Sequence, residues 1–246
     1  MNKETSFVSN QTIDYLDSIE VPIPYDSLRV RVHGDAYAEG FKKIGKIVSI
    51  DVYNNLKNKV NVDSDELNIL DFGCGCGRII LYLKHLFPEM NFYGTDIDSE
   101  AIYWCQENIK DYGDFKVNNF LPPLSYNSDF FDFVYVISVF THLPQDMENA
   151  WLSELSRVVK PGGYLLISTH GEHFWDSAPN DAKNKFFEKG FEFIKGKQTD
   201  GLPDFYHCSY HTKKYVLKEW KKYFEIIDFI PKGICNHQDL VVCQKK

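Results

Sequence analysis

From residue 67 onward, short apolar runs alternate with amphipathic segments along the chain. Residues 131–137 form a near-continuous apolar run, as a strand buried on both faces of a sheet requires. Apolar residues in the intervening segments recur at helical spacing. This alternation predicts an α/β fold with a mostly parallel sheet and helices on both faces. The expected strands are 67–72, 91–95, 115–118, 131–137, 164–168, 224–230 and 239–243, and the expected helices are 79–87, 98–109, 144–159 and 212–222.

Residues 1–64 do not follow this rhythm, and we expect them to form an N-terminal extension, or lid, beside a domain of residues 65–246. Within the extension, apolar residues at helical spacing predict a helix over 38–58, and a shorter helix is expected at 14–19. Residues 171–211 are rich in aromatic residues and show no clear period. They are interpreted as an insertion over the ligand-binding edge of the sheet.

Three glycines stand at alternate positions after the first strand, in Ile69-Leu70-Asp71-Phe72-Gly73-Cys74-Gly75-Cys76-Gly77-Arg78. Glycine permits positive φ and close approach of a ligand to the backbone, and the following helix N-terminus offers unpaired N–H groups. A nicotinamide-dinucleotide turn reads Gly-x-Gly-x-x-Gly, whereas here the third glycine comes one residue early. Asp96 ends the second strand roughly 20 residues further on, where an acid accepts hydrogen bonds from ribose hydroxyls. The spacing predicts a nucleotide-type cofactor.

Four motifs, in order and spacing, resemble those of the Rossmann-like class I S-adenosylmethionine-dependent methyltransferases. They are the glycine turn, Tyr93-Gly94-Thr95-Asp96-Ile97-Asp98, Phe130-Phe131-Asp132-Phe133-Val134 and Arg157-Val158-Val159-Lys160-Pro161-Gly162-Gly163-Tyr164-Leu165. The resemblance covers residues 67–170. It implies a seven-stranded sheet whose last strand is antiparallel, S-adenosylmethionine as cofactor, and a turn at Pro161-Gly162-Gly163 before the fifth strand.

The resemblance also implies which residues hold the methionine part of the cofactor. The backbone of Gly73, Gly75 and Gly77 passes beneath it. Asp71 helps to hold its ammonium group, directly or through water. The backbone around Ser138 is expected to contact the same amino group.

The adenosine part of the cofactor is assigned in the same way. Asp96 is expected to hold the ribose, and either Asn118 or Asn119 to read the adenine amino group. Ile97 stacks on the adenine or packs in the core. Asp98 is better explained as the cap of the following helix.

A hydroxyl acceptor needs a general base to remove its proton. The candidates are His142 after the fourth strand, His170 after the fifth, and His207 in the insertion. Cys74-x-Cys76 lies inside the glycine turn, and no second pair has finger-like spacing, so no metal site is expected.

A looser resemblance extends beyond these four motifs. Phe140-Thr141-His142-Leu143-Pro144, Ser168-Thr169-His170-Gly171 and His237-Gln238-Asp239-Leu240 resemble a bacterial methyltransferase subgroup associated with polysaccharide biosynthesis. This resemblance says little about the acceptor. From the motifs as a whole we expect transfer to an oxygen or nitrogen atom of a small molecule or sugar-containing precursor. The fourth strand ends without the Asn-Pro-Pro-Tyr of many base-methylating members, so nucleic acid is not expected as a partner.

The net charge of −8 also argues against sequence-independent binding to nucleic acid or anionic membranes. No apolar run approaches the roughly 20 residues that cross a bilayer, and no leader of signal-peptide length is visible. We therefore expect a cytoplasmic protein with reduced cysteines. Two alternatives stay open: an NAD(P)-dependent oxidoreductase, and a non-catalytic scaffold that binds S-adenosylmethionine.

Overall fold

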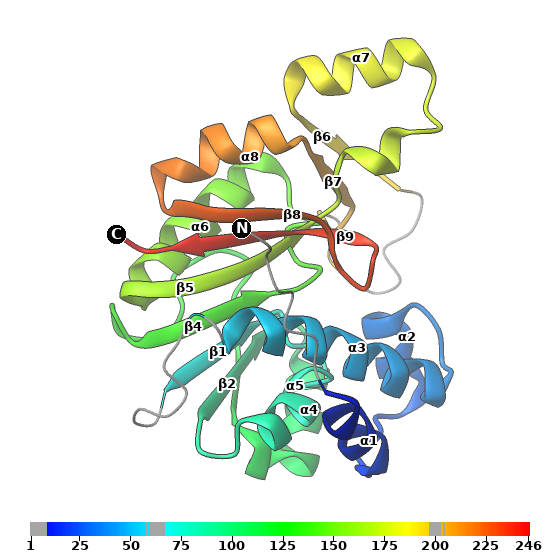
Figure 1. Cartoon of the computed structure of the whole chain (residues 1–246), viewed down its shortest axis with the longest axis vertical. Coiled ribbons are helices and arrows are strands. Elements are labelled where there is room, and N and C mark those ends of the chain that lie inside the picture. The colour runs from blue at the N-terminus through cyan, green and yellow to red at the C-terminus, as the bar shows by residue number, and fades with distance from the viewer. Residues whose placement is uncertain (1–8, 58, 60–66, 197–202, 204) are drawn as a thin grey trace.

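The computed structural model describes residues 9–57, 59, 67–196, 203 and 205–246. Its centre is a seven-stranded sheet with the order β3-β2-β1-β4-β5-β9-β8 (Figure 1). The first five strands in this order pair in parallel, and β9 is antiparallel to both β5 and β8. The predicted sheet, with its last strand antiparallel, is confirmed. The strands are β1 (Asn68–Phe72), β2 (Asn91–Asp96), β3 (Asp114–Val117), β4 (Phe131–Val136), β5 (Val159–Thr169), β8 (Glu225–Ile234) and β9 (Gln238–Gln244).

Helices cover both faces of this sheet (Figure 1). Side chains alternate between the faces along the central strands, so that Ile69 belongs to one buried cluster and Leu70 to the other. The first cluster includes side chains of the N-terminal helices, α4 and α5, and the second includes those of α6 and α8. Burial on both faces explains the continuous apolar runs of the central strands. These helices are α4 (Ile80–Leu86), α5 (Ser99–Asn108), α6 (Gln145–Val158) and α8 (Lys213–Glu219).

Three helices precede the sheet: α1 (Asn10–Ser18), α2 (Asp26–His33) and α3 (Ala38–Leu56). Helices α1 and α3 correspond to the two predicted ones, although residue 58 lies outside the described residues. Helix α2 was not predicted. Leu28, its central apolar residue, is fully buried, which shows that tertiary packing stabilises this short helix.

The prediction of a turn at Pro161-Gly162-Gly163 is wrong. β5 starts at Val159, before these residues, and includes them. Val159 pairs with Phe131 and Tyr164 pairs with Phe133, so the residues between them bulge out of the ladder. A bulge absorbs the extra residues without ending the strand, which is why the Pro-Gly signal did not mark a strand boundary.

The segment 171–211, whose sequence shows no clear period, contains α7 (Asn180–Lys189), β6 (Phe191–Ile194) and β7 (Cys208–His211). β6 and β7 pair antiparallel into a second, two-stranded sheet beyond one edge of the main sheet (Figure 1). The backbone N–H of Ser209 donates to the carbonyl of Thr141 at 2.7 Å. This bond ties the insertion to the loop that follows β4.

Glu148 of α6 anchors the insertion to the main domain. Its carboxylate is completely buried and contacts Nε2 of His211 at 2.6 Å. The Tyr215 hydroxyl and the Trp220 indole N–H donate to its other oxygen at 3.1 and 2.9 Å. A buried carboxylate is tolerated when it is hydrogen-bonded in this way. β7 and α8 are therefore fixed to α6 and, through it, to the main sheet.

Candidate active site

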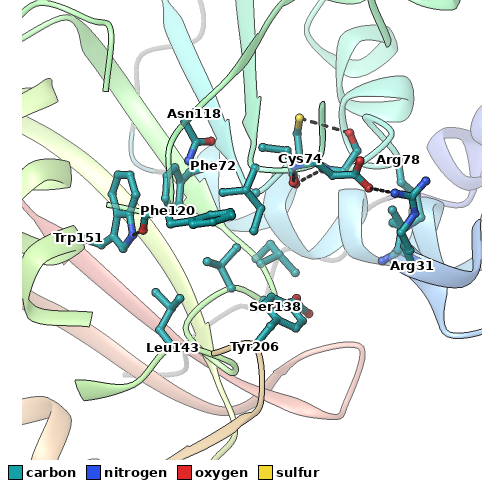
Figure 2. A pocket seen from close by; sticks show the side chains of 18 of the residues that line it. Arg31, Phe72, Cys74, Arg78, Asn118, Phe120, Ser138, Leu143, Trp151 and Tyr206 are labelled. Atoms are coloured by element: carbon teal, nitrogen blue, oxygen red, sulfur yellow. Dashed lines mark hydrogen bonds and ion pairs between the residues drawn. The ribbon is translucent and has the colours of Figure 1, made fainter. Parts of the chain in front are cut away.

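A pocket opens at the carboxyl ends of β1, β2, β3 and β4, with about 1000 Å³ of space that is partly open to solvent (Figure 2). Ligands bind at this edge in open α/β sheets. Its lining residues are Arg31, Val32, Phe72, Gly73, Cys74, Gly75, Arg78, Ile79, Asp96, Ile97, Asp98, Asn118, Phe120, Ile137, Ser138, Val139, Leu143, Met147, Trp151, Phe205 and Tyr206.

The glycine turn forms the floor of this pocket. Gly73 has φ +82° and Gly75 has φ +52°, and a Cβ on Gly73 would lie 2.2 Å from the side chain of Val139. A Cβ on Gly75 would lie 2.7 Å from the side chain of Val32. Gly77 instead faces the core, where a Cβ would meet Ile109 at 2.5 Å, and it does not line the pocket. Gly73 and Gly75 therefore bring backbone alone to the pocket, because a side chain on either would collide with Val139 or Val32, and Gly77 permits packing against α5.

Asp96 joins the glycine turn to the end of β2. One oxygen of its carboxylate accepts from the N–H of Gly75 at 2.7 Å, and the other accepts from the N–H of Asp98 at 2.8 Å. Burial raises the pKa of Asp96 above its ordinary value, and the two N–H donors oppose that rise. Asp98 caps α5 by accepting from Glu100 and Ala101, as predicted. Asp71 is 1% exposed and does not line the pocket.

The structure distinguishes the two candidate asparagines after β3. Asn118 lines the pocket, and its backbone N–H donates to the carbonyl of Asp96 at 3.0 Å. Its side-chain amide donates to the carbonyl of Asn119, which is exposed and outside the lining. Ile97 lines the pocket and belongs to neither buried cluster. Phe120 follows on the same loop and brings an aromatic ring to the wall.

The three histidines proposed as bases do not line the pocket. The His142 ring lies behind Tyr206, stacked on it at 4.1 Å between ring centroids, and its Nδ1 is 2.8 Å from the carbonyl oxygen of His207. The His170 ring packs on Phe174 at 4.5 Å. The imidazole of His207 accepts from a backbone N–H of the insertion at 3.2 Å. Burial lowers the pKa of His142 to about 4 and that of His170 to about 3. Their role as bases stays a prediction.

Two walls of the pocket come from outside the sheet. Arg31 and Val32 belong to α2, and the Arg31 guanidinium pairs with Asp98 at 2.8 Å and with Glu100. The Tyr25 hydroxyl donates to the same Glu100 carboxylate. These contacts hold α2 against the start of α5. Sequence reasoning gave Arg31 no role, because nothing in its neighbourhood predicted α2.

The opposite wall consists of Phe205 and Tyr206, which precede β7. The Phe205 ring packs edge-on against Phe120 at 5.3 Å, and the Tyr206 hydroxyl donates to the carbonyl of Ser138 at 3.5 Å (Figure 2 shows Phe120, Ser138 and Tyr206). Burial raises the pKa of Tyr206 further above its ordinary value, so its hydroxyl is a hydrogen-bond donor at neutral pH. The aromatic content of the insertion was the sequence signal for this wall.

The order of strands, with β9 antiparallel, and the pocket over the glycine turn define a class I S-adenosylmethionine-dependent methyltransferase fold. Residues 70–167 match the family model described as a methyltransferase domain. This part of the chain is therefore a methyltransferase domain of that class. No helix in the described part of the chain is both long and apolar enough to span a membrane.

The chain is 29% identical over 147 residues to O-methyltransferase 3 of Dictyostelium discoideum, covering 53% of this chain and 33% of the relative. It is 27% identical over 163 residues to the fatty-acid O-methyltransferase of Mycolicibacterium smegmatis, covering 63% and 58%. The chain thus spans less than two thirds of either relative's length. A solved S-adenosylmethionine-dependent methyltransferase from Methanosarcina mazei superposes with a TM-score of 0.56 at 25% identity, covering 78% of this chain and 96% of that one.

The residues of the pocket fit S-adenosylmethionine. Gly73 and Gly75 line the pocket with backbone alone, since a side chain on either would collide with Val139 or Val32, and Asp96 offers carboxylate oxygens beside them. Asn118 adds an amide and Ser138 a backbone carbonyl. Together they supply acceptors for hydroxyl and ammonium groups and a polar side chain for a base edge.

Proposed function

We propose that this protein transfers the methyl group of S-adenosylmethionine to an oxygen atom of a small, largely apolar molecule. The observation that carries the proposal is the convergence of Gly73, Gly75, Asp96 and Asn118 on one pocket at the carboxyl edge of the sheet. Bound S-adenosylmethionine supplies an activated methyl group on a sulfonium. The protein's task is then largely to position the acceptor, which can contribute roughly 7–11 kcal/mol to lowering the barrier.

Each cofactor-binding residue has a role in this proposal. Asp96 accepts from the ribose hydroxyls, Asn118 faces the adenine edge, and Ile97 packs on the adenine ring. The glycine turn lies beneath the methionine part. Asp71, buried below the turn, acts on that part only through the backbone or water.

The acceptor class is inferred from the wall opposite α2. Phe205, Phe120 and Leu143 present apolar surface to the pocket, with Tyr206 as a polar tip. Such a wall suits an apolar body carrying one reactive oxygen. Relatives named as O-methyltransferases, one of them acting on fatty acids, support oxygen as the methylated atom. α2 and the segment with Phe205 are proposed to exclude water from the reaction.

The test is a methyl-transfer assay with radiolabelled S-adenosylmethionine against saturated fatty acids, simple phenols and sugar nucleotides. Methylation of a fatty acid or a phenol is expected, and transfer only to the sugar nucleotides would favour the saccharide acceptor instead. Calorimetry with S-adenosylhomocysteine and NADH examines the cofactor separately. Saturable binding of NADH without binding of S-adenosylhomocysteine would refute the proposal in favour of an oxidoreductase. Tight S-adenosylhomocysteine binding without transfer to any acceptor would favour the non-catalytic scaffold.

A further inference from the structure

Ser138, at the end of β4, has an unusual backbone conformation for a residue with a side chain. Its φ is +61°, in the left-handed region that favours glycine. Such a conformation costs free energy and persists only where surrounding contacts enforce it. Because Ser138 lines the pocket, its conformation determines where its carbonyl oxygen lies relative to a bound ligand.

Three side chains enforce this conformation. The N–H of Ser138 donates to Oγ of Ser168, on β5, at 2.8 Å. The hydroxyl of Ser138 lies 2.9 Å from Nε2 and 3.1 Å from Oε1 of Gln238, the first residue of β9. The Tyr206 hydroxyl reaches its carbonyl. Ser168 is fully buried and Gln238 is 9% exposed, so these partners are held in fixed positions.

The position of Gln238 is fixed by its neighbour, Asp239. The carboxylate of Asp239 accepts from the backbone N–H of Lys232 at 2.8 Å. It also lies against Gly171, where a Cβ would meet Asp239 Oδ2 at 1.8 Å. These contacts hold the start of β9 against the ends of β5 and β8. Gln238 is thereby directed at Ser138, 100 residues away in sequence.

We propose that Gln238 is a positioning residue for cofactor binding, an inference that rests on the proposed function. Its side-chain amide holds the Ser138 hydroxyl and so maintains the left-handed turn. That turn keeps the Ser138 carbonyl in place to accept a hydrogen bond from the ammonium group of the cofactor. Without the amide, Ser138 relaxes to an ordinary backbone conformation and its carbonyl rotates.

The test is a double-mutant cycle between positions 238 and 138, read as affinity for S-adenosylhomocysteine by calorimetry. Gln238→Leu is expected to weaken binding about tenfold. Ser138→Ala loses the hydroxyl but keeps a Cβ, which disfavours positive φ, so it should weaken binding similarly. In a Ser138→Gly background, glycine adopts positive φ freely, so adding Gln238→Leu should cost less than twofold.

Gln244→Leu is the matched control, since Gln244 lies at the other end of β9 and donates to the carbonyl of Gly162 at 2.9 Å. Its affinity should equal that of the wild type. Thermal unfolding of each variant confirms folding at the assay temperature. If Gln238→Leu binds like the wild type, or loses the same factor in both backgrounds, Gln238 has no positioning role. If the wild type itself binds no S-adenosylhomocysteine, the proposed function fails as well.

Discussion

Replacing Asp96 by alanine tests the centre of the proposed site. The substitution removes the acceptor of two backbone N–H groups, those of Gly75 at 2.7 Å and Asp98 at 2.8 Å. It also removes the proposed partner of the ribose hydroxyls. The first loss loosens the glycine turn, and the second removes contacts made only with the cofactor.

The size of the effect follows from the kind of bond. A hydrogen bond to a charged group contributes about 1.5–3 kcal/mol, and about 1.4 kcal/mol corresponds to a factor of ten in affinity. Loss of even one ribose bond therefore weakens S-adenosylhomocysteine binding at least tenfold, and loss of both about a hundredfold or more. Asp96→Asn keeps one acceptor oxygen and should lie between the wild type and Asp96→Ala.

Calorimetry over a range of pH adds a second measure. Burial raises the pKa of Asp96, so its carboxylate takes up a proton at a higher pH than an exposed aspartate does. Wild-type affinity should fall as the pH drops through that pKa, and Asp96→Asn should lose this dependence.

Asp132→Ala is the matched control. Asp132 also accepts from a backbone N–H, that of Asn68 at 2.9 Å, but it lies at the start of β4, far from the carboxyl ends of the strands where the pocket opens. It should lower the thermal midpoint and leave affinity unchanged. Unchanged affinity in Asp96→Ala would refute the ribose assignment.

Three further outcomes are expected. Arg31→Gln breaks the ion pairs with Asp98 and Glu100 and should speed dissociation of S-adenosylhomocysteine about two- to fivefold in stopped flow. Lys42→Gln should leave the dissociation rate unchanged, because Lys42 pairs with Glu39 outside the pocket. The buried His142 and His170 stay neutral in the folded protein, whereas histidines of the unfolded chain bind protons near pH 6.5. The free energy of unfolding should therefore fall as the pH drops from about 6.5 to 4, by at most about 1.4 kcal/mol per pH unit for each histidine. His170→Phe should flatten this slope in urea titrations. Unfractionated tRNA should accept no labelled methyl group, and its methylation would contradict the inference from net charge.

The sequence predicted those site residues that directly follow strands. Gly73 and Asn118 directly follow β1 and β3, Asp96 is the last residue of β2, and Ser138 lies two residues beyond β4. Parallel strands bring their carboxyl ends to one edge. These residues could therefore be placed at one edge of the sheet without knowing the order of the strands. The same reasoning does not say whether a side chain reaches the pocket: His142 follows β4 but lies outside the lining, because a strand end fixes where the backbone lies and not where the side chain points.

Residues outside the sheet were harder to predict. Arg31 lies on α2, whose sequence alternates apolar and polar residues and lacks a capping side chain at Tyr25. Long-range contacts decide its structure, such as that of Val32 with Gly75. Tyr206 depends likewise on the buried bonds of Glu148 that fix β7.

Sheet topology explains why a motif near the end of the chain completes a pocket built by its first strands. β9 runs antiparallel to its neighbours, so its first residues lie where β5 ends. The start of an antiparallel strand thus shares an edge with the carboxyl ends of parallel ones. Gln238 and Asp239 can therefore reach Ser138 and Gly171. The sequence alone does not show what His237-Gln238-Asp239 contacts. The direction of β9 does: Gln238 and Asp239 hold the loops after β4 and β5, on which the cofactor is proposed to rest.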